Sequence, residues 1–188
     1  TVFFIVLCSN AVNFVDGLDG LATGVVGIGA LAFFAYSYLL TVTEGLTRAT
    51  TSSLVTVAIA GACLGFLPHN FFPARMFMGD SGALVLGFTL ASISVAGLLK
   101  TASTVVLFLP LLVLAVPIID TSFVVARRLK YRRPISSPDR SHLHHRFMRI
   151  GFTQRRAALT MWAWTASLGA AALATRFIPL REGGEWHL

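Results

Sequence analysis

The stretch Asn10–Gly24, NAVNFVDGLDGLATG, places polar groups between two strongly apolar segments. Its two carboxylates, two amides and three glycines are Asp16, Asp19, Asn10, Asn13, Gly17, Gly20 and Gly24. At the end of an apolar segment such groups are costly unless they face water, a metal or a ligand. The stretch is therefore either a polar turn at a membrane surface or a site for a polar, phosphorylated ligand.

The composition indicates an integral membrane protein. The 188 residues are 55% hydrophobic and 12% charged, whereas soluble domains carry about 25% charged residues. We predict an all-α fold, a polytopic transmembrane helix bundle, because helices satisfy their own backbone in lipid. Residues 1–188 form one membrane domain of about five full spans plus a partial first span. The chain begins without Met inside an apolar run, so we expect a fragment truncated at its N-terminus.

The apolar segments predict where the spans lie. Expected spans are 20–40, 52–67, 81–99, 104–126 and 156–176. Small residues predict close helix contacts at Gly20, Gly24, Gly27 and Gly29 in one span and at Gly61 and Gly65 in another. Cys8 and Cys63 lie in apolar segments without CxxC spacing, so we interpret them as core residues.

The basic residues indicate the orientation in the membrane. If the spans alternate, the loops that share one face are 10–19, 68–80 and 127–155. With Arg156 at its edge, that face holds 11 of the 15 Lys and Arg residues. Cytoplasmic loops are rich in Lys and Arg, so we place it in the cytoplasm. The same face receives Asp16, Asp19 and Asp80, which favours one shared cytoplasmic site.

Three carboxylates and two amides on this face form a set of oxygen ligands. The residues are Asp16, Asp19, Asp80, Asn13 and Asn70. Such a set suits a hard cation, and Mg²⁺ in particular takes one or two carboxylates together with substrate phosphates; Mn²⁺ is the alternative ion. Taken alone, Asp80 could equally be a helix N-cap.

The basic region 127–155 contains a histidine cluster. The segment Ser141–Arg146, SHLHHR, combines His142, His144 and His145 with Arg146, which suits a clamp for a diphosphate. A solvated basic face is the alternative, and the run Arg127–Arg133 suits anionic lipid headgroups. Residues 139–150 predict a short basic helix on the membrane surface. Phe77 suits either packing or stacking on a base.

Three stretches together resemble one family, the polyprenyl-phosphate N-acetylhexosamine-1-phosphate transferases. They are NAVNFVDGLDGLATG, NFFPARMFMGDSGALVLGF and PIIDTSFVVARRLKYRRPISSPDRSHLHHRFMRIGFTQRR. The PDRSHLHH form is similar to the branch that uses UDP-N-acetylglucosamine (UDP-GlcNAc). The resemblance implies Mg²⁺-dependent transfer of N-acetylglucosamine-1-phosphate to undecaprenyl phosphate, with release of UMP. It also implies a bacterial inner-membrane enzyme, active on the cytoplasmic side, that starts teichoic-acid or O-antigen-type polysaccharides.

The resemblance also implies roles for individual residues. Catalytic roles fall on Asp80, Asp16, Asp19, His144 and His145, with Asp80 and Asp16 as the metal ligands. Substrate-binding roles fall on Asn13, Gly17, Leu18, Asn70, Phe77, His142 and Arg146. Within this set, Gly17, Leu18, Asp19 and Phe77 resemble a uracil pocket, and the histidines with Arg146 resemble a loop that contacts the diphosphate and sugar.

One departure from the family and several alternatives remain. The family has an Asp-Asp pair in an early cytoplasmic loop, and this chain contains no such dipeptide. We attribute its absence to truncation and expect the chain alone to be catalytically incomplete. The nearest alternative is a phospho-N-acetylmuramoyl-pentapeptide transferase. A transporter would need carboxylates near the membrane midplane, and a non-catalytic envelope scaffold stays open, as does a homodimer. Expected partners are the two substrates and membrane lipid, not nucleic acid.

Overall fold

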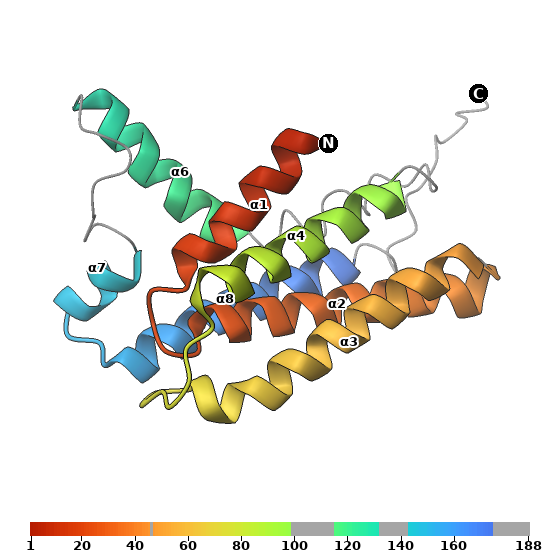
Figure 1. The fold of residues 1–188 in the computed structure, drawn as a ribbon, viewed down its shortest axis with the longest axis horizontal. Helices are drawn as coiled ribbons and strands as arrows, with labels where there is room; N and C mark the ends of the chain where they lie inside the picture. Colours follow the sequence, from red (N-terminus) through yellow and green to blue (C-terminus); the bar gives the residue numbers. More distant parts are fainter. Residues whose placement is uncertain (46, 99–114, 132–142, 175–188) are drawn as a thin grey trace, which may run out of the picture.

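The computed structural model describes residues 1–45, 47–98, 115–131 and 143–174, and every regular element in these ranges is an α-helix (Figure 1). The helices are α1 Val2–Val15, α2 Leu21–Glu44, α3 Thr47–Asn70, α4 Gly79–Leu98, α6 Ala115–Lys130, α7 Leu143–Arg149 and α8 Gln154–Ala174. The prediction of an all-α helix bundle is confirmed.

Four of the described helices are long and apolar enough to cross a membrane. They contain the segments Leu21–Thr43, Ala49–Asn70, Gly79–Ala96 and Gln154–Ala174. These segments overlap four of the predicted spans. The remaining predicted span, 104–126, lies partly outside the described residues, and its described part belongs to α6.

Helix α2 is the centre of the bundle. It packs most extensively against α3 and also contacts α8, α4 and α1. One buried cluster joins the first four helices and includes Cys8, Val26, Phe33, Cys63 and Leu90. Both cysteines are free and buried, as expected of core residues.

A second buried cluster attaches α8 to the beginning of α2. Its members include Val15 at the end of α1, Leu18 and Leu21 around the following turn, and Met161 in α8. The indole N–H of Trp162 donates a hydrogen bond to the Leu21 carbonyl oxygen over 3.3 Å. The N-terminal ends of α2 and α8 are therefore fixed side by side.

The glycine prediction is confirmed at Gly24 and Gly27 in α2 and not in α3. A Cβ at Gly24 would lie 1.9 Å from Trp162 Cε2, and one at Gly27 would lie 3.1 Å from Cys63 Cβ. A side chain at Gly24 would collide with the indole, and one at Gly27 would be tightly packed against Cys63, so glycine favours both close approaches. Around Gly61 and Gly65, in contrast, no described atom lies within 4 Å of such a Cβ. Spacing predicts that a helix can approach, but does not identify the face on which it does so.

Two predicted loops are shorter than expected because the helices before them continue. Helix α1 runs to Val15, so loop 10–19 is reduced to residues 16–20. Helix α3 runs to Asn70, which reduces loop 68–80 to residues 71–78. Pro68 does not end α3, since a proline in the last turn removes only one helical hydrogen bond and the Phe71 N–H still donates to the Leu67 carbonyl (2.8 Å).

The predicted basic loop 127–155 is largely helical in its described part. Helix α6 continues to Lys130, and α8 begins at Gln154. Helix α7 corresponds to the short basic helix predicted over 139–150. Figure 1 shows α7, the beginning of α8 and the loops 16–20 and 71–78 at the same end of the bundle. The turn at Gly45, between α2 and α3, lies at the opposite end.

Candidate functional site

Asp16 is the first residue after α1, and its carboxyl is partly buried. Burial raises its pKa from the usual 3.8 to about 6, and the negative charge of Asp80 adds to the effect. Burial disfavours an ionised carboxyl, and a neighbouring carboxylate disfavours it further. The end of α1 and the beginning of α4 thus bring two acidic groups into electrostatic contact, as the topology predicted.

Asn13, in the last turn of α1, contributes an unsatisfied acceptor to this end. Its Oδ1 is buried, and no described group donates a hydrogen bond to it. Buried polar atoms normally have partners, so an orphaned oxygen three residues before Asp16 indicates a missing donor or cation. Asn10 differs, because its exposed Nδ2 donates to the Val6 carbonyl of its own helix (2.8 Å).

Asp19 joins the two loops. Its Oδ2 accepts a hydrogen bond from the backbone N–H of Ala74 over 3.0 Å. Gly20, the next residue, has φ +74°, and a Cβ there would lie 3.0 Å from Phe71 Cδ2. Side chains rarely adopt that backbone conformation, so glycine permits the close approach of loop 71–78. Gly17 is exposed, whereas Leu18 is only 6% exposed and packs in the second cluster.

Asn70 lies at the other end of loop 71–78 and is 2% exposed. Its Oδ1 accepts a hydrogen bond from Thr23 Oγ1 over 2.6 Å. Its Nδ2 donates to the Met76 carbonyl oxygen over 2.9 Å. Both ends of the amide are therefore engaged within the protein.

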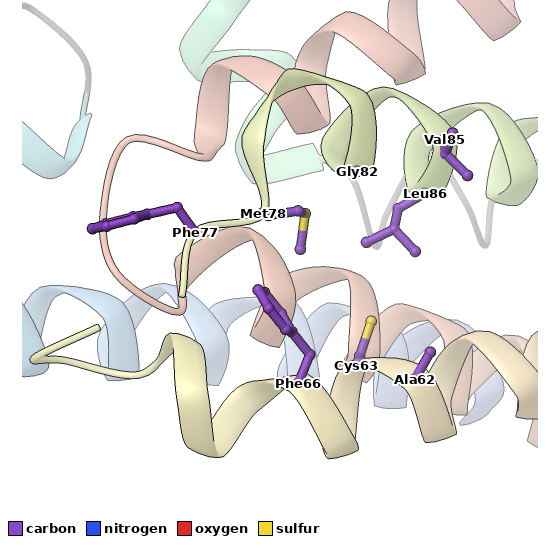
Figure 2. A pocket seen from close by; sticks show the side chains of 8 residues that line it. All are labelled: Ala62, Cys63, Phe66, Phe77, Met78, Gly82, Val85 and Leu86. Atoms are coloured by element: carbon purple, nitrogen blue, oxygen red, sulfur yellow. The ribbon is translucent and has the colours of Figure 1, made fainter. Parts of the chain in front are cut away.

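Phe77 lies near the end of this anchored loop, and Asp80 follows it in α4. Phe77 is 77% exposed, and Figure 2 shows its ring projecting away from Cys63 and Ala62. Gly79, with φ +67°, turns the chain into α4, where the exposed Asp80 occupies the first turn. A bare aromatic face beside a helix N-terminus can stack on a base while the helix dipole favours negative charge.

A cavity of about 280 Å³ between α3 and α4 is separate in character from this polar region. Figure 2 shows its lining residues, Ala62, Cys63, Phe66, Phe77, Met78, Gly82, Val85 and Leu86. The lining side chains are apolar, so the cavity offers no group that would bind a charged nucleotide.

Helices α7 and α8 contribute basic residues to the end of the bundle that carries loops 16–20 and 71–78. The Arg146 guanidinium lies 5.5 Å from the centroid of the Phe123 ring, which links α7 to α6. Arg155 Nε donates to the Phe72 carbonyl over 3.2 Å, and its guanidinium lies over the Phe72 ring. The side chains of His144 and His145 and the whole of His142 lie outside the described part of the structure. Their predicted roles remain predictions.

The described residues bring part of the predicted set together. Asp16, Asp19, Asn13, Phe77 and Asp80 share one end of the bundle. No three His, Cys, Asp or Glu side chains in the described ranges gather closely enough to hold a metal ion. Substrate phosphate and water oxygens normally complete a Mg²⁺ site, so two carboxylates remain a suitable protein contribution.

Sequence reasoning missed three residues that build this end. Thr23, Arg155 and Trp162 each contact a loop or helix end through a hydrogen bond. Their sequence signals were weak: a hydroxyl in a span, one arginine among many and a tryptophan near the beginning of a span. Each partner is far away in the chain, so no local pattern identifies it.

The fold and the site together identify the class of protein: it is a polytopic helical membrane protein with acidic and basic groups at one end of the bundle. Residues 1–98 match the profile of glycosyl transferase family 4. The chain belongs to this family.

Several curated relatives resemble the chain. A probable undecaprenyl-phosphate N-acetylglucosaminyl 1-phosphate transferase of Bacillus subtilis is 42% identical, over 86% of this chain and 43% of the relative. A decaprenyl-phosphate N-acetylglucosaminephosphotransferase of Mycobacterium leprae is 40% identical, over 93% and 47%. A phospho-N-acetylmuramoyl-pentapeptide-transferase of Desulforudis audaxviator is 37% identical, over 93% and 48%. The chain spans about half the length of these relatives.

Proposed function

We propose that the complete protein transfers N-acetylglucosamine-1-phosphate from UDP-GlcNAc to undecaprenyl phosphate and releases UMP. Two relatives, 42% and 40% identical to this chain, carry names for this type of reaction. The single structural observation that carries the proposal is the electrostatic interaction of Asp16 with Asp80. The buried Asn13 oxygen precedes Asp16 by three residues, and the exposed Phe77 ring precedes Asp80 by three residues. A span end of this kind suits a soluble nucleotide that reacts with a lipid-anchored acceptor.

The reaction exchanges one phosphorus–oxygen bond for another. An oxygen of the acceptor phosphate attacks the phosphorus that carries the sugar. The bond from that phosphorus to the UMP oxygen breaks, and UMP leaves with the electron pair. The product is the sugar joined to the lipid through a diphosphate. Such a transfer asks the protein mainly to position the reactants and to neutralise charge.

The residues present fit a Mg²⁺ ion, with Mn²⁺ as a substitute. Asp80 and Asp16 would hold it, since two carboxylates that repel each other are relieved by a divalent cation between them. The buried Asn13 oxygen, which has no hydrogen-bond donor among the described residues, would add a further acceptor near the ion. When bound, the ion supplies positive charge to the diphosphate and the leaving UMP.

The chain's own residues orient the nucleotide. The exposed Phe77 ring offers a stacking face for uracil, and the exposed Gly17 allows the nucleotide to approach the backbone. Asp19 holds loop 16–20 against loop 71–78 through Ala74. Leu18, whose side chain is buried, would contribute its backbone. These assignments extend the uracil pocket that the sequence predicted.

The basic side of the site would bind the diphosphate and the sugar. Arg146 is exposed at the end that also carries Asp80, and we assign His142, His144 and His145 to the same task. Concentrated positive charge there supports a cytoplasmic location for this end in a bacterial inner membrane. UDP-sugars are made in the cytoplasm, so the orientation agrees with the reaction.

Donor preference tests the proposal. The complete protein, purified in detergent with undecaprenyl phosphate and Mg²⁺, is supplied with UDP-GlcNAc or with UDP-N-acetylmuramoyl-pentapeptide, and UMP release is followed. We expect release with UDP-GlcNAc and little with the muramoyl donor. The reverse preference would assign the protein to the branch of the Desulforudis audaxviator relative. No release with either donor would overturn the proposed chemistry.

A further inference from the structure

A buried chain of two hydrogen bonds crosses the bundle beneath the proposed site. Thr23, in the first turn of α2, is 1% exposed and donates to Asn70 Oδ1 over 2.6 Å. Asn70 ends α3 and donates from Nδ2 to the Met76 carbonyl over 2.9 Å. One side-chain amide therefore connects α2, α3 and the residue that precedes Phe77.

The orientation of this amide is set by its surroundings. A flipped Asn70 would direct its oxygen at the Met76 carbonyl, so that two acceptors would face each other. In the observed orientation, the amide nitrogen meets the carbonyl and the oxygen meets a hydroxyl donor. The Thr23 hydroxyl thus completes the only arrangement of Asn70 that satisfies Met76.

Met76 is held on both of its peptide groups. Its N–H donates to the His69 carbonyl over 3.0 Å, and its C=O accepts from Asn70. The N–H of Arg75 donates to the same His69 oxygen over 2.8 Å. Phe77 follows directly, and two residues later Gly79 turns the chain towards Asp80. The position of both functional side chains thus depends on where Met76 is fixed.

We infer that Thr23 and Asn70 are positioning residues that set Phe77 and Asp80 through the Met76 carbonyl. The inference rests on the proposed function, because it concerns the site for the UDP-sugar. Thr23 is too deeply buried to touch a substrate, so an effect of its hydroxyl on ligand binding must pass through Asn70. Removing that hydroxyl leaves a buried acceptor without a partner and frees the amide to reorient.

The same two helices supply a matched control. Ser53 Oγ, in α3, donates to Ser37 Oγ, in α2, over 2.9 Å, and both residues are buried. This bond lies nearer the opposite end of the helix pair and contacts neither loop. Its loss weakens the α2–α3 interface without releasing Met76.

The experiment measures UMP binding and thermal stability of the complete protein in detergent. Thr23→Val preserves shape and removes the hydroxyl, and we expect it to weaken UMP binding about tenfold, the effect of about one lost hydrogen bond to a buried group. Thr23→Ser restores the donor and should bind within about twofold of wild type. Ser53→Ala should lower the melting temperature comparably and leave UMP affinity unchanged.

A second variant covers the case in which Thr23→Val does not fold. Asn70→Asp keeps the acceptor for Thr23 and removes the donor to Met76, and it should weaken UMP binding at least as much. Unchanged UMP affinity in a folded Thr23→Val or Asn70→Asp protein would overturn the positioning role. An equal loss in Ser53→Ala would overturn it too, by assigning the effect to general destabilisation. If the wild-type protein binds no UMP, the proposed function fails, and the positioning role with it.

Discussion

The two ends of the α2–α3 pair are built differently. Near one end, Ser37 and Ser53 form a hydrogen bond between the helices, and Gly45, with φ +64°, turns the chain almost directly from α2 towards α3. Near the other end, Thr23 and Asn70 form the equivalent bond, but loops enter and leave there. The α2–α3 pair, which we call the frame, thus has a short turn at one end and carries loops 16–20 and 71–78 of the proposed site at the other.

This difference separates the residues that stabilise the helix pair from those that position the loops. Helices α2 and α3 form the largest helix–helix contact of the described bundle, and one buried apolar cluster includes residues of both. Among the described residues, the loop end adds hydrogen bonds between segments 47 to 83 positions apart, through Asp19, Asn70 and Arg155. We conclude that the long helices provide stability, while these few polar ties determine the shape of the site.

The largest expected difference between the two ends is the effect on activity of removing one carboxylate from each. Asp80→Asn at the loop end should lower Mg²⁺-dependent UMP release by a factor on the order of a thousand, because it removes the carboxylate that we propose as a metal ligand. Glu44→Gln, at the C-terminal end of α2, is the matched control and should keep its rate. Equal activity of Asp80→Asn and wild type would remove Asp80 from the metal site.

A packing change tests the frame itself. Gly24→Ala introduces a Cβ 1.9 Å from Trp162 Cε2, so the indole must move and its bond to Leu21 is strained. We expect a loss of about 1–3 kcal/mol in the free energy of unfolding. Gly61→Ala meets nothing within 4 Å among the described residues and should be neutral or slightly stabilising. Thermal unfolding in detergent compares the two, and equal melting temperatures would contradict the packing of α8 on α2.

The carboxyl of Asp16 gives a pH-dependent effect. Its folded pKa, about 6, lies above the usual 3.8, so the fold favours the protonated form. That stabilisation is complete below about pH 3.8 and is lost as the pH rises through 6. In metal-free protein, Asp16→Asn should therefore melt a few degrees above wild type at pH 8, with the gap shrinking by pH 4.5. Wild type melting at or above the variant at pH 8 would contradict the shift.

The smallest expected effect concerns the tie from α8. Arg155→Gln removes the donor to the Phe72 carbonyl and the charge over its ring. Because this contact is exposed, the KM for UDP-GlcNAc should rise only about threefold, with kcat unchanged. Arg156→Gln is the control, since the contact of Arg156 with Thr153 is made by its backbone N–H. A change in kcat alone would place Arg155 outside the positioning of loop 71–78.

Sequence reasoning predicted the frame because the signals for spans are local. Length, apolar composition and charge bias were enough to predict an all-α bundle and to place loops 10–19, 68–80 and 127–155 on one face. In the structure the shortened loops 16–20 and 71–78 lie at one end of the bundle with α7. The helix ends were predicted less well: Asn13 lies within α1 and Pro68 within α3. Polar residues and proline are tolerated in a last turn, where few hydrogen bonds remain to be lost.

The candidate site was predictable only where a residue type carries its own chemistry. Asp16 and Asp80 were found because carboxylates at span ends are unusual, and the structure brings their charges together. Thr23 could not be found, because its importance lies in a hydrogen bond to a residue 47 positions away. Asp19 was predicted at the nucleotide site, yet its observed contact ties loops together through a backbone N–H, which no sequence pattern records.

Photolabelling tests the central claim most directly, namely that the uracil binds at the loop end of the α2–α3 pair. The complete protein is irradiated with 5-azido-UDP-GlcNAc and Mg²⁺, and the labelled peptides are mapped by mass spectrometry. We predict labelling within residues 71–80, at Phe77 or its neighbours, that excess UMP abolishes. Labelling confined to the Gly45 end, or labelling at residues 71–80 that UMP does not compete with, would contradict the account.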